Sequence, residues 1–389
     1  MKLMNKFYSL LALLLVGSAS LQAQSAPFPD ISTVAYKYQG TMQCTSQVMM
    51  NGEIVTDAVV AAYCGDDFRG KNSTGEDPGH PNHVYLTIYG DNTASKQYLH
   101  FKVFAQGKVF TCNPDPAFVY TFNGIVGSTA NPYIIDITPV SLANNADNMS
   151  TLTTYKDKTC DVVLTGRTLY KNGNWNTICL PFTLTASEVN EHLENPTGLM
   201  TLSSSSFDST TGILTMNFCD ELENGMVAGK PYIVKWTTGD DLVNPVFTGV
   251  TISDATADVS TDYVDFLGIY STTVIYEDGA DKHNLYLGSG NNLYYPSREG
   301  YSLKACRAYF QLKNGLTAGD ASQQARAFVL NFDDEGTQTT GIVEAEANSS
   351  LFTLHSSLSE CYTLDGRKLD GQPTKKGLYI HEGRKVVIK

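Results

Sequence analysis

One stretch of the chain almost has the spacing of a nucleotide-binding phosphate loop. Residues Gly65 to Asn72 read GDDFRGKN and meet the GxxxxGK spacing, but Asn72 stands where a Ser or Thr would hold Mg²⁺. Asp66 and Asp67 would repel phosphates, and the following STGEDPGHP cannot form the helix that such a loop requires. We therefore expect a turn between two strands here and no nucleotide site.

Three patterns resemble metal sites, and each is incomplete. His80 and His83 share a polar loop, where such a pair is more commonly solvated than bound to a metal. His381 begins a zincin-like pattern, but Lys385 replaces its second histidine. The stretch NFDDEG begins like a calcium loop, whose twelfth position is Ile342 in place of Glu. We expect no metal site and no cofactor, with an adventitious Ca²⁺ in an Asp-rich loop left open.

Catalytic motifs are missing as well. The GxSxG elbow of hydrolases does not occur, and the seven histidines stand in no recognisable nucleophile context. A glycosidase, however, needs only two carboxyl groups at a suitable separation, which a sequence with 40 acids does not reveal. The sequence therefore favours a non-catalytic protein, and a secreted, glycoside hydrolase-like enzyme is the alternative.

Aromatic residues supply the one pattern that suits binding. Tyr294, Tyr295 and Tyr301 flank a Pro-Ser-Arg-Glu-Gly turn, and Trp175 stands between asparagines in NGNWN. Exposed aromatic rings on a β-sheet suit sugars or protein partners, whereas core packing at strand ends is the competing interpretation. These four are the candidate ligand-binding residues, and the candidate partner is a glycan or a surface or matrix protein.

The charge and the N-terminus bear on partners and location. A formal net charge of -13 disfavours nucleic acid and anionic bilayers as partners. Lys2 and Lys6 precede an apolar run from Leu10 to Val16, and small residues follow, which predicts a signal peptide over residues 1–24 cleaved after Ala23 or Gln24. No later apolar run reaches the length of a membrane span, so we expect an exported chain without a transmembrane segment.

The secondary-structure elements that position these residues are predicted to be mostly strands. Period-two alternation of β-branched and aromatic residues occurs in VYLTIYGD, LHFKVFAQG, KPYIVKW and RAYFQLK, and Asn-Gly turns separate such runs. One short helix is expected after the capping box of Thr185 and Glu188, ending by Pro196. The eight cysteines form no CxxC pair and are either disulfide-bonded or buried thiols.

Two polar stretches divide the mature chain. Residues 138–151 are Asn-rich, and residues 333–350 form an acidic linker. We expect an all-β protein with two β-sandwich-like domains, over 27–140 and 141–332, followed by a small C-terminal β unit over 341–389. In that unit the segments LYI and KVVI are expected to pair as strands, with lysines keeping the edge soluble.

The C-terminal unit resembles a known family. From Tyr362 to the end the chain carries seven basic and three acidic residues, opposite in sign to the whole. It resembles the C-terminal sorting tails of proteins that Bacteroidetes export by type IX (Por) secretion. The resemblance is carried by Gly366, Arg367, Lys376, Gly377, Gly383, Lys385 and Lys389. It implies contact with export machinery and a location outside the cell or on the outer surface of a Gram-negative bacterium.

The larger domains resemble exported modules of the same bacteria. In the central domain the resemblance rests on RTLYKNGNWNTICLPF, AGKPYIVKW and LYLGSGNNLYYPS, and it implies no activity. In the N-terminal domain it rests on NGEIVTDAVVAAYCGDDFRG and YLTIYGD. Together these observations predict an exported surface or secreted protein of binding or adhesion type.

Overall fold

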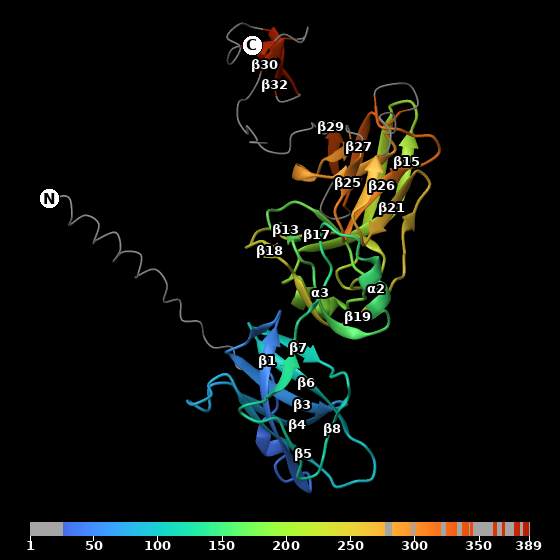
Figure 1. Ribbon diagram of the computed structural model, residues 1–389. Helices are drawn as coiled ribbons and strands as arrows, with labels where there is room; N and C mark the ends of the chain where they lie inside the picture. Colours follow the sequence, from blue (N-terminus) through green and yellow to red (C-terminus); the bar gives the residue numbers. More distant parts are fainter. Residues whose placement is uncertain are drawn as a thin grey trace, which may run out of the picture. The chain divides into compact units, whose positions relative to one another are not determined.

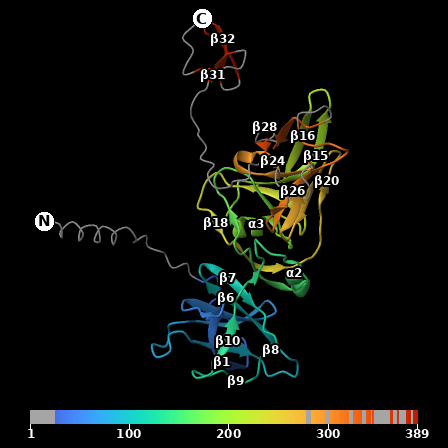
Figure 2. The ribbon, with the colours of Figure 1, turned by 45° about the horizontal axis from the view of Figure 1, so that its top comes forward.

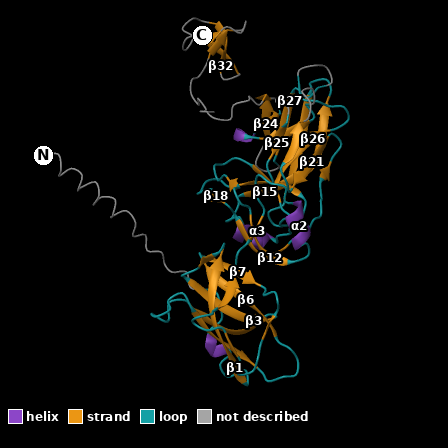
Figure 3. Cartoon of the chain, viewed as in Figure 1, coloured by secondary structure: helices purple, strands orange, loops and turns teal. Residues whose placement is uncertain are grey.

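Strands dominate the computed structural model (Figure 3). The structure describes residues 26–276, 282–296, 300–319, 324–332, 337–341, 343–344, 361–363, 368–369, 377–381 and 384–388. The expected all-β architecture with sandwich-like domains is confirmed. The expected signal peptide, with Ala23 and Gln24, lies outside the described residues.

The N-terminal domain consists of two sheets and one 3-10 turn, η1 (Ile31–Thr33). In the first sheet β1 is central and pairs with all the other strands. Its members are β1 (Gly40–Met50), β2 (Glu53–Ile54), β5 (Val84–Gly90), β9 (Ile125–Val126) and β10 (Tyr133–Asp136). The second sheet contains β3 (Ala58–Cys64), β4 (Asp67–Ser73), β6 (Tyr98–Ala105), β7 (Lys108–Cys112) and β8 (Phe118–Val119).

Alternation along the strands builds the core of this domain. On β5 every second residue is buried, so Leu86 and Ile88 point inward as the sequence predicts. They share a core with Val60 of β3 and Phe101 of β6. The turn expected in the phosphate-loop-like stretch lies at Gly65 and Asp66, between β3 and β4, with Gly65 at a φ of 57°, and the rest of the stretch belongs to β4.

The central domain contains a second sandwich. One sheet has the order β14 (Asn176–Cys179), β17 (Pro231–Lys235), β15 (Gly198–Asp208), β16 (Ile213–Asp220), β27 (Ala327–Asn331), β28 (Thr337–Gly341). The other has the order β20 (Val259–Ser260), β21 (Val264–Ile269), β26 (Arg307–Leu312), β23 (Asn284–Leu287), β24 (Leu293–Tyr295), β29 (Val343–Glu344). Phe218 from the first sheet packs against Phe266 and Phe310 from the second. Figures 1 and 2 show the strands of these sheets side by side.

A further core of the central domain combines short sheets with two helices. Its elements are β11 (Val140–Ser141), β12 (Thr159–Val163), β13 (Thr168–Leu169), β18 (Leu242–Val243), β19 (Val246–Thr251), α2 (Met149–Tyr155) and α3 (Ala186–His192). The helix α3 has the predicted capping box, but it ends four residues before Pro196. The helix α2 is unexpected and arises in the Asn-rich stretch. Neither helix of the described residues is long and apolar enough to cross a membrane.

Strand β17 takes part in both cores. Tyr232 and Val234 pack into the core that contains the helices, whereas Ile233 packs into the core of the sandwich. The sequence predicts these opposite faces, since the residues alternate, and the structure buries both of them.

The stretch predicted as an acidic linker is partly structured. Strand β28 pairs with β27 over five residue pairs, and β29 pairs with β24, so Thr337–Gly341 and Val343–Glu344 extend the two sheets of the central sandwich. The threonines and β-branched residues here pair at sheet edges, which the weak hydrophobic pattern did not indicate. The chain divides into compact units at a later point, 1–345 and 346–389.

The C-terminal unit contains a four-stranded antiparallel sheet. Its order is β31 (Lys368–Leu369), β30 (Cys361–Thr363), β32 (Gly377–His381), β33 (Arg384–Ile388). The predicted pairing of LYI with KVVI is confirmed, because Leu378 lies opposite Val387. Of the sorting-tail residues, Gly377 and Lys385 lie in these strands, and Gly366, Arg367, Lys376, Gly383 and Lys389 lie outside the described residues.

Deleting residues 346–389 tests the independence of this unit. Because the chain divides into two compact units after Ala345, we expect the melting temperature of the remaining protein to change by less than about 2 °C. Differential scanning calorimetry of the two chains measures the shift. A fall of about 10 °C or more would mean that the unit supports the central core and would contradict the division.

Candidate functional site

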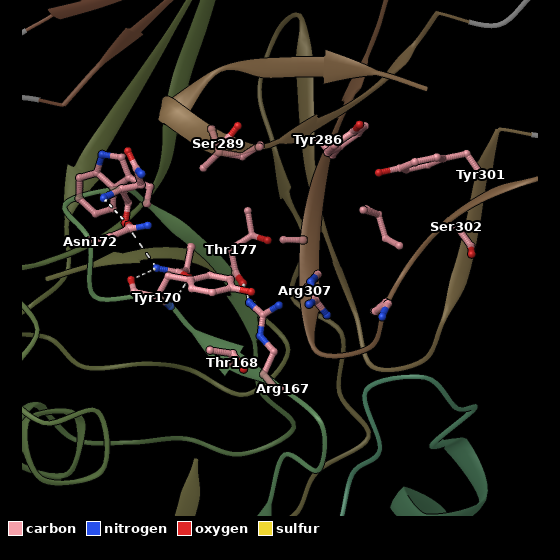
Figure 4. Close-up of a pocket in the computed structure, with 18 residues that line it drawn as sticks. Arg167, Thr168, Tyr170, Asn172, Thr177, Tyr286, Ser289, Tyr301, Ser302 and Arg307 are labelled. Atoms are coloured by element: carbon pink, nitrogen blue, oxygen red, sulfur yellow. Dashed lines mark hydrogen bonds between the residues drawn. The ribbon is translucent and has the colours of Figure 1, made fainter. Parts of the chain in front are cut away.

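A cavity of about 530 Å³ opens in the central domain (Figure 4). Strands β14 and β26, which contact one another from opposite sheets, contribute to its walls together with β13, β23 and β25 (Tyr301–Leu303). The strand β25 pairs with β22 (Thr273–Tyr276). The lining consists of Arg167, Thr168, Tyr170, Asn172, Asn174, Trp175, Asn176, Thr177, Tyr286, Leu287, Gly288, Ser289, Tyr301, Ser302, Leu303, Lys304, Arg307 and Ala308.

Arg167 is the most deeply buried charged group of this lining. Its residue exposes 5% of its surface, and its Nη2 donates to the backbone oxygen of Thr177 at 2.8 Å. Its buried Nε has no hydrogen-bond partner among the described residues. Burial, with the like charge of Arg307 adding to it, lowers the pKa of Arg167 to about 9.

Arg307 is the second cation and lies beside Arg167 in Figure 4. Its Nη1 donates to the side-chain oxygen of Asn144 at 2.6 Å and to the backbone oxygen of Ala305 at 3.1 Å. Burial lowers its pKa too. The preceding residue, Cys306, is buried at a φ of 54°, a conformation that costs a non-glycine residue roughly 1–3 kcal/mol. The backbone is therefore strained where it presents Arg307.

Neither guanidinium has an acidic partner in the described part of the chain. The ion pairs found there involve other residues, as in Lys171 with Glu194. The described residues of the cavity lining include no Asp or Glu, while Lys304 adds a third cation. The acceptors of the two arginines are all neutral amide or carbonyl oxygens.

Asn144 forms hydrogen bonds with the side chain of Arg307 and with the backbone next to Arg167. Its side-chain nitrogen donates to the backbone oxygen of Gly166, next to Arg167, at 2.9 Å, and its side-chain oxygen accepts from Arg307. Its backbone oxygen accepts from the nitrogen of Ala305 at 2.9 Å. One neutral side chain thus fixes the backbone beside one guanidinium and contacts the other directly.

Stacked tyrosines form the wall of the cavity that lies across from Tyr170. The ring of Tyr286 stacks on Tyr301 with centroids 5.0 Å apart and on Tyr294 at 5.6 Å. Gly288 permits this stack, because a side chain there would collide with the ring of Tyr294. Tyr170 is 54% exposed and extends into the cavity from the other side (Figure 4).

The structure separates the four residues that the sequence singled out. Tyr301 and Trp175 line the cavity, although Trp175 exposes only 6% of its surface and packs on Phe332 at 5.1 Å. Tyr294 stacks on Tyr286 and is not among the described lining residues. Tyr295 is buried in the core of the sandwich, as the alternative of core packing at strand ends predicts.

Sequence reasoning missed Arg167, Arg307, Tyr170, Tyr286 and Asn144. The arginines are separated by 140 positions and belong to no motif, so only the fold brings them together. The sequence held a weak signal for Arg307 and Tyr286. Arg307 begins the strand RAYFQL and Tyr286 lies in the strand NLYL, and in both strands the residues that alternate with it are apolar. Asn144 stands in the Asn-rich stretch that reads as a domain boundary.

The other histidine, carboxylate and thiol groups considered for chemistry have structural roles. His80 bonds Asp77 at 3.0 Å, and no group of three or more potential metal ligands occurs among the described residues. Burial raises the pKa of Asp161 to about 6, but its carboxylate accepts backbone N–H bonds from Thr111 and Gly249 and does not line the cavity. Six of the described cysteines are free thiols, namely Cys44, Cys64, Cys112, Cys160, Cys179 and Cys306.

Comparison with known proteins assigns neither a family nor a function to the chain. No protein-family model matches the chain, and neither the curated proteins nor the solved structures give a significant match. The geometry of the cavity is therefore the basis for any functional inference.

Replacing Arg167 with Met tests whether this cation stabilises the fold. A cation whose pKa falls on folding destabilises the native state at every pH below the lowered value, here about 9. We expect Arg167→Met to leave the free energy of unfolding at pH 7 within about 1 kcal/mol of the original or to raise it. Urea unfolding measures this change.

Arg69→Met is the matched control. Arg69 is also buried, but it pairs with Asp67 at 3.4 Å and stacks on Tyr38 at 4.2 Å. Its loss should destabilise the protein by about 2 kcal/mol or more. If Arg167→Met destabilised the protein as much as Arg69→Met, the arginine would be a structural residue.

Proposed function

We propose that this protein is an exported, non-catalytic binding protein of adhesion type whose central domain holds a glycan in the cavity. The observation that carries the proposal is a concave site with tyrosines on both sides and no acid in its described lining. The apolar face of a sugar ring packs on aromatic rings, and its hydroxyl groups bond to amides and hydroxyls. Asn172, Ser289 and Ser302 offer such groups here.

The size of the cavity favours a glycan over a protein partner. Small-molecule sites occupy roughly 300–1,000 Å³, a range that includes this cavity. A stable protein interface buries about 800 Å² on each partner and is usually flatter. A surface or matrix protein would therefore engage this protein through a glycan that it carries.

Export is a separate part of the proposal. It is supported by the basic and apolar N-terminal stretch and by the resemblance of the C-terminal unit to type IX sorting tails. A binding protein with this unit would be secreted or displayed on the outer surface of a Gram-negative cell. The alternative of a hydrolase has no specific support, because the described lining offers no carboxylate pair.

Substitution of one exposed tyrosine tests the site. We expect Tyr170→Ala to weaken glycan binding about tenfold, because loss of one stacked ring removes roughly 1–1.5 kcal/mol. Isothermal titration of the mature chain with oligosaccharides of neutral hexoses and of uronic acids measures the affinity. The control is Tyr98→Ala, since Tyr98 is equally exposed at 54% but lies on β6 of the N-terminal domain.

The same titrations distinguish the candidate functions. Equal loss of affinity in both variants would place the glycan elsewhere, and no binding by any oligosaccharide would refute the proposal. Release of reducing sugar ends from these oligosaccharides would instead support the hydrolase.

A further inference from the structure

We propose that Arg167 and Arg307 make this site selective for an acidic sugar, whose carboxylate binds between the two guanidinium groups. This inference rests on the proposed glycan-binding function and adds the class of glycan. It follows from the charge of the site, from the way in which the fold holds the arginines, and from the aromatic wall beside them.

The charge of the cavity is opposite to that of the chain. The chain has a formal net charge of -13, yet the described lining contains three cations and no acid. Arg167 is buried and the neighbouring Arg307 is half-buried, an arrangement that is unfavourable unless an anion joins them. An anionic ligand would supply the missing charge.

The fold leaves the donors of both arginines available. Arg167 uses Nη2 for its one hydrogen bond to the described residues, and Arg307 uses only Nη1. The side chain that contacts Arg307 is Asn144, an amide, where an aspartate would have neutralised the cation. The fold therefore positions the guanidinium groups without cancelling their charge.

A carboxylate on a sugar ring fits this arrangement best. Guanidinium groups bind planar carboxylates through paired N–H donors, which fixes the orientation of the ligand. The ring that carries the carboxylate would lie between Tyr286 and Tyr170, which line opposite sides of the cavity (Figure 4). A free anion would contact the arginines but leave these rings unused.

The first test uses the unaltered protein with two matched ligands. Tetragalacturonate and its fully methyl-esterified form have the same rings and differ in charge. We expect the acid to bind at least about tenfold more tightly than the ester at 50 mM salt, since charge-assisted hydrogen bonds are about twice as strong as neutral ones. Inorganic phosphate and sulfate, titrated alone, should bind more weakly than the acid.

The second test uses Asn144→Asp, which places a carboxylate beside Arg307 in a side chain of almost the same shape. We expect the ratio of the affinity for the acid to the affinity for the ester to fall about tenfold or more. Arg307→Lys keeps the positive charge but loses the paired N–H donors of the guanidinium group, and it should also reduce the preference for the acid. Asn92→Asp, on an exposed N-terminal loop outside the cavity, controls for the added charge.

The outcomes distinguish failure of the selectivity for acids from failure of glycan binding itself. Melting curves of the variants show whether they are folded, and the comparison of acid with ester requires no variant. Equal binding of acid and ester would overturn the selectivity for acids and leave glycan binding intact. Binding of neither would overturn the selectivity for acids, and glycan binding as well if the neutral oligosaccharides also failed to bind. Tighter binding of free phosphate or sulfate than of tetragalacturonate would overturn the assignment of a sugar carboxylate.

Discussion

The central domain depends on the burial of strand β17 on both faces. Tyr232 and Val234 complete one core, and Ile233 completes the other, so neither core can shift without the other. The neighbouring strand β14 is held by its pairing with β17 and supplies the backbone oxygen of Thr177 to Arg167. The cavity beside β14 therefore has walls that are fixed by two packed cores, which suits a preorganised binding site.

The buried Arg167 and the half-buried Arg307 differ from the other charged groups of the described chain in what they contact. Most charged groups of the described chain are paired or exposed, whereas Arg167 and Arg307 are bonded to neutral oxygens. Such an arrangement lowers stability, and strain at Cys306 adds to the cost. Proteins retain unfavourable groups of this kind at functional sites, because the favourable interaction forms only with the ligand. The net negative charge of the chain would also disfavour anions that lack the further contacts a sugar makes.

Much of the fold could be predicted from local patterns. Alternation placed Leu86, Ile88 and Phe310 inward, and the capping box of Thr185 with Glu188 located α3, because each signal acts over a few residues. The edge strands β28 and β29 were missed, since their pairing depends on neighbours far along the chain. In the C-terminal sheet the pairing of β32 with β33 followed from their apolar runs, whereas β30 and β31 were not predicted, and the role of the unit in export stays a prediction.

The site was less accessible to sequence reasoning. Aromatic residues drew attention to Tyr301 and Trp175, yet the same argument selected Tyr295, which is a core residue. Composition cannot separate a packed ring from an exposed one, because both occur at strand ends. The arginines were missed for a different reason. Their significance lies in the absence of a nearby acid within the described structure, which is a property of three-dimensional neighbourhood alone.

A crystal structure of the protein with tetragalacturonate tests the central claim most directly. The account predicts a carboxylate within hydrogen-bonding distance of both Arg167 and Arg307, with its sugar ring against Tyr286 or Tyr170. A ligand bound elsewhere, or bound in the cavity with its carboxylates directed to solvent, would contradict it.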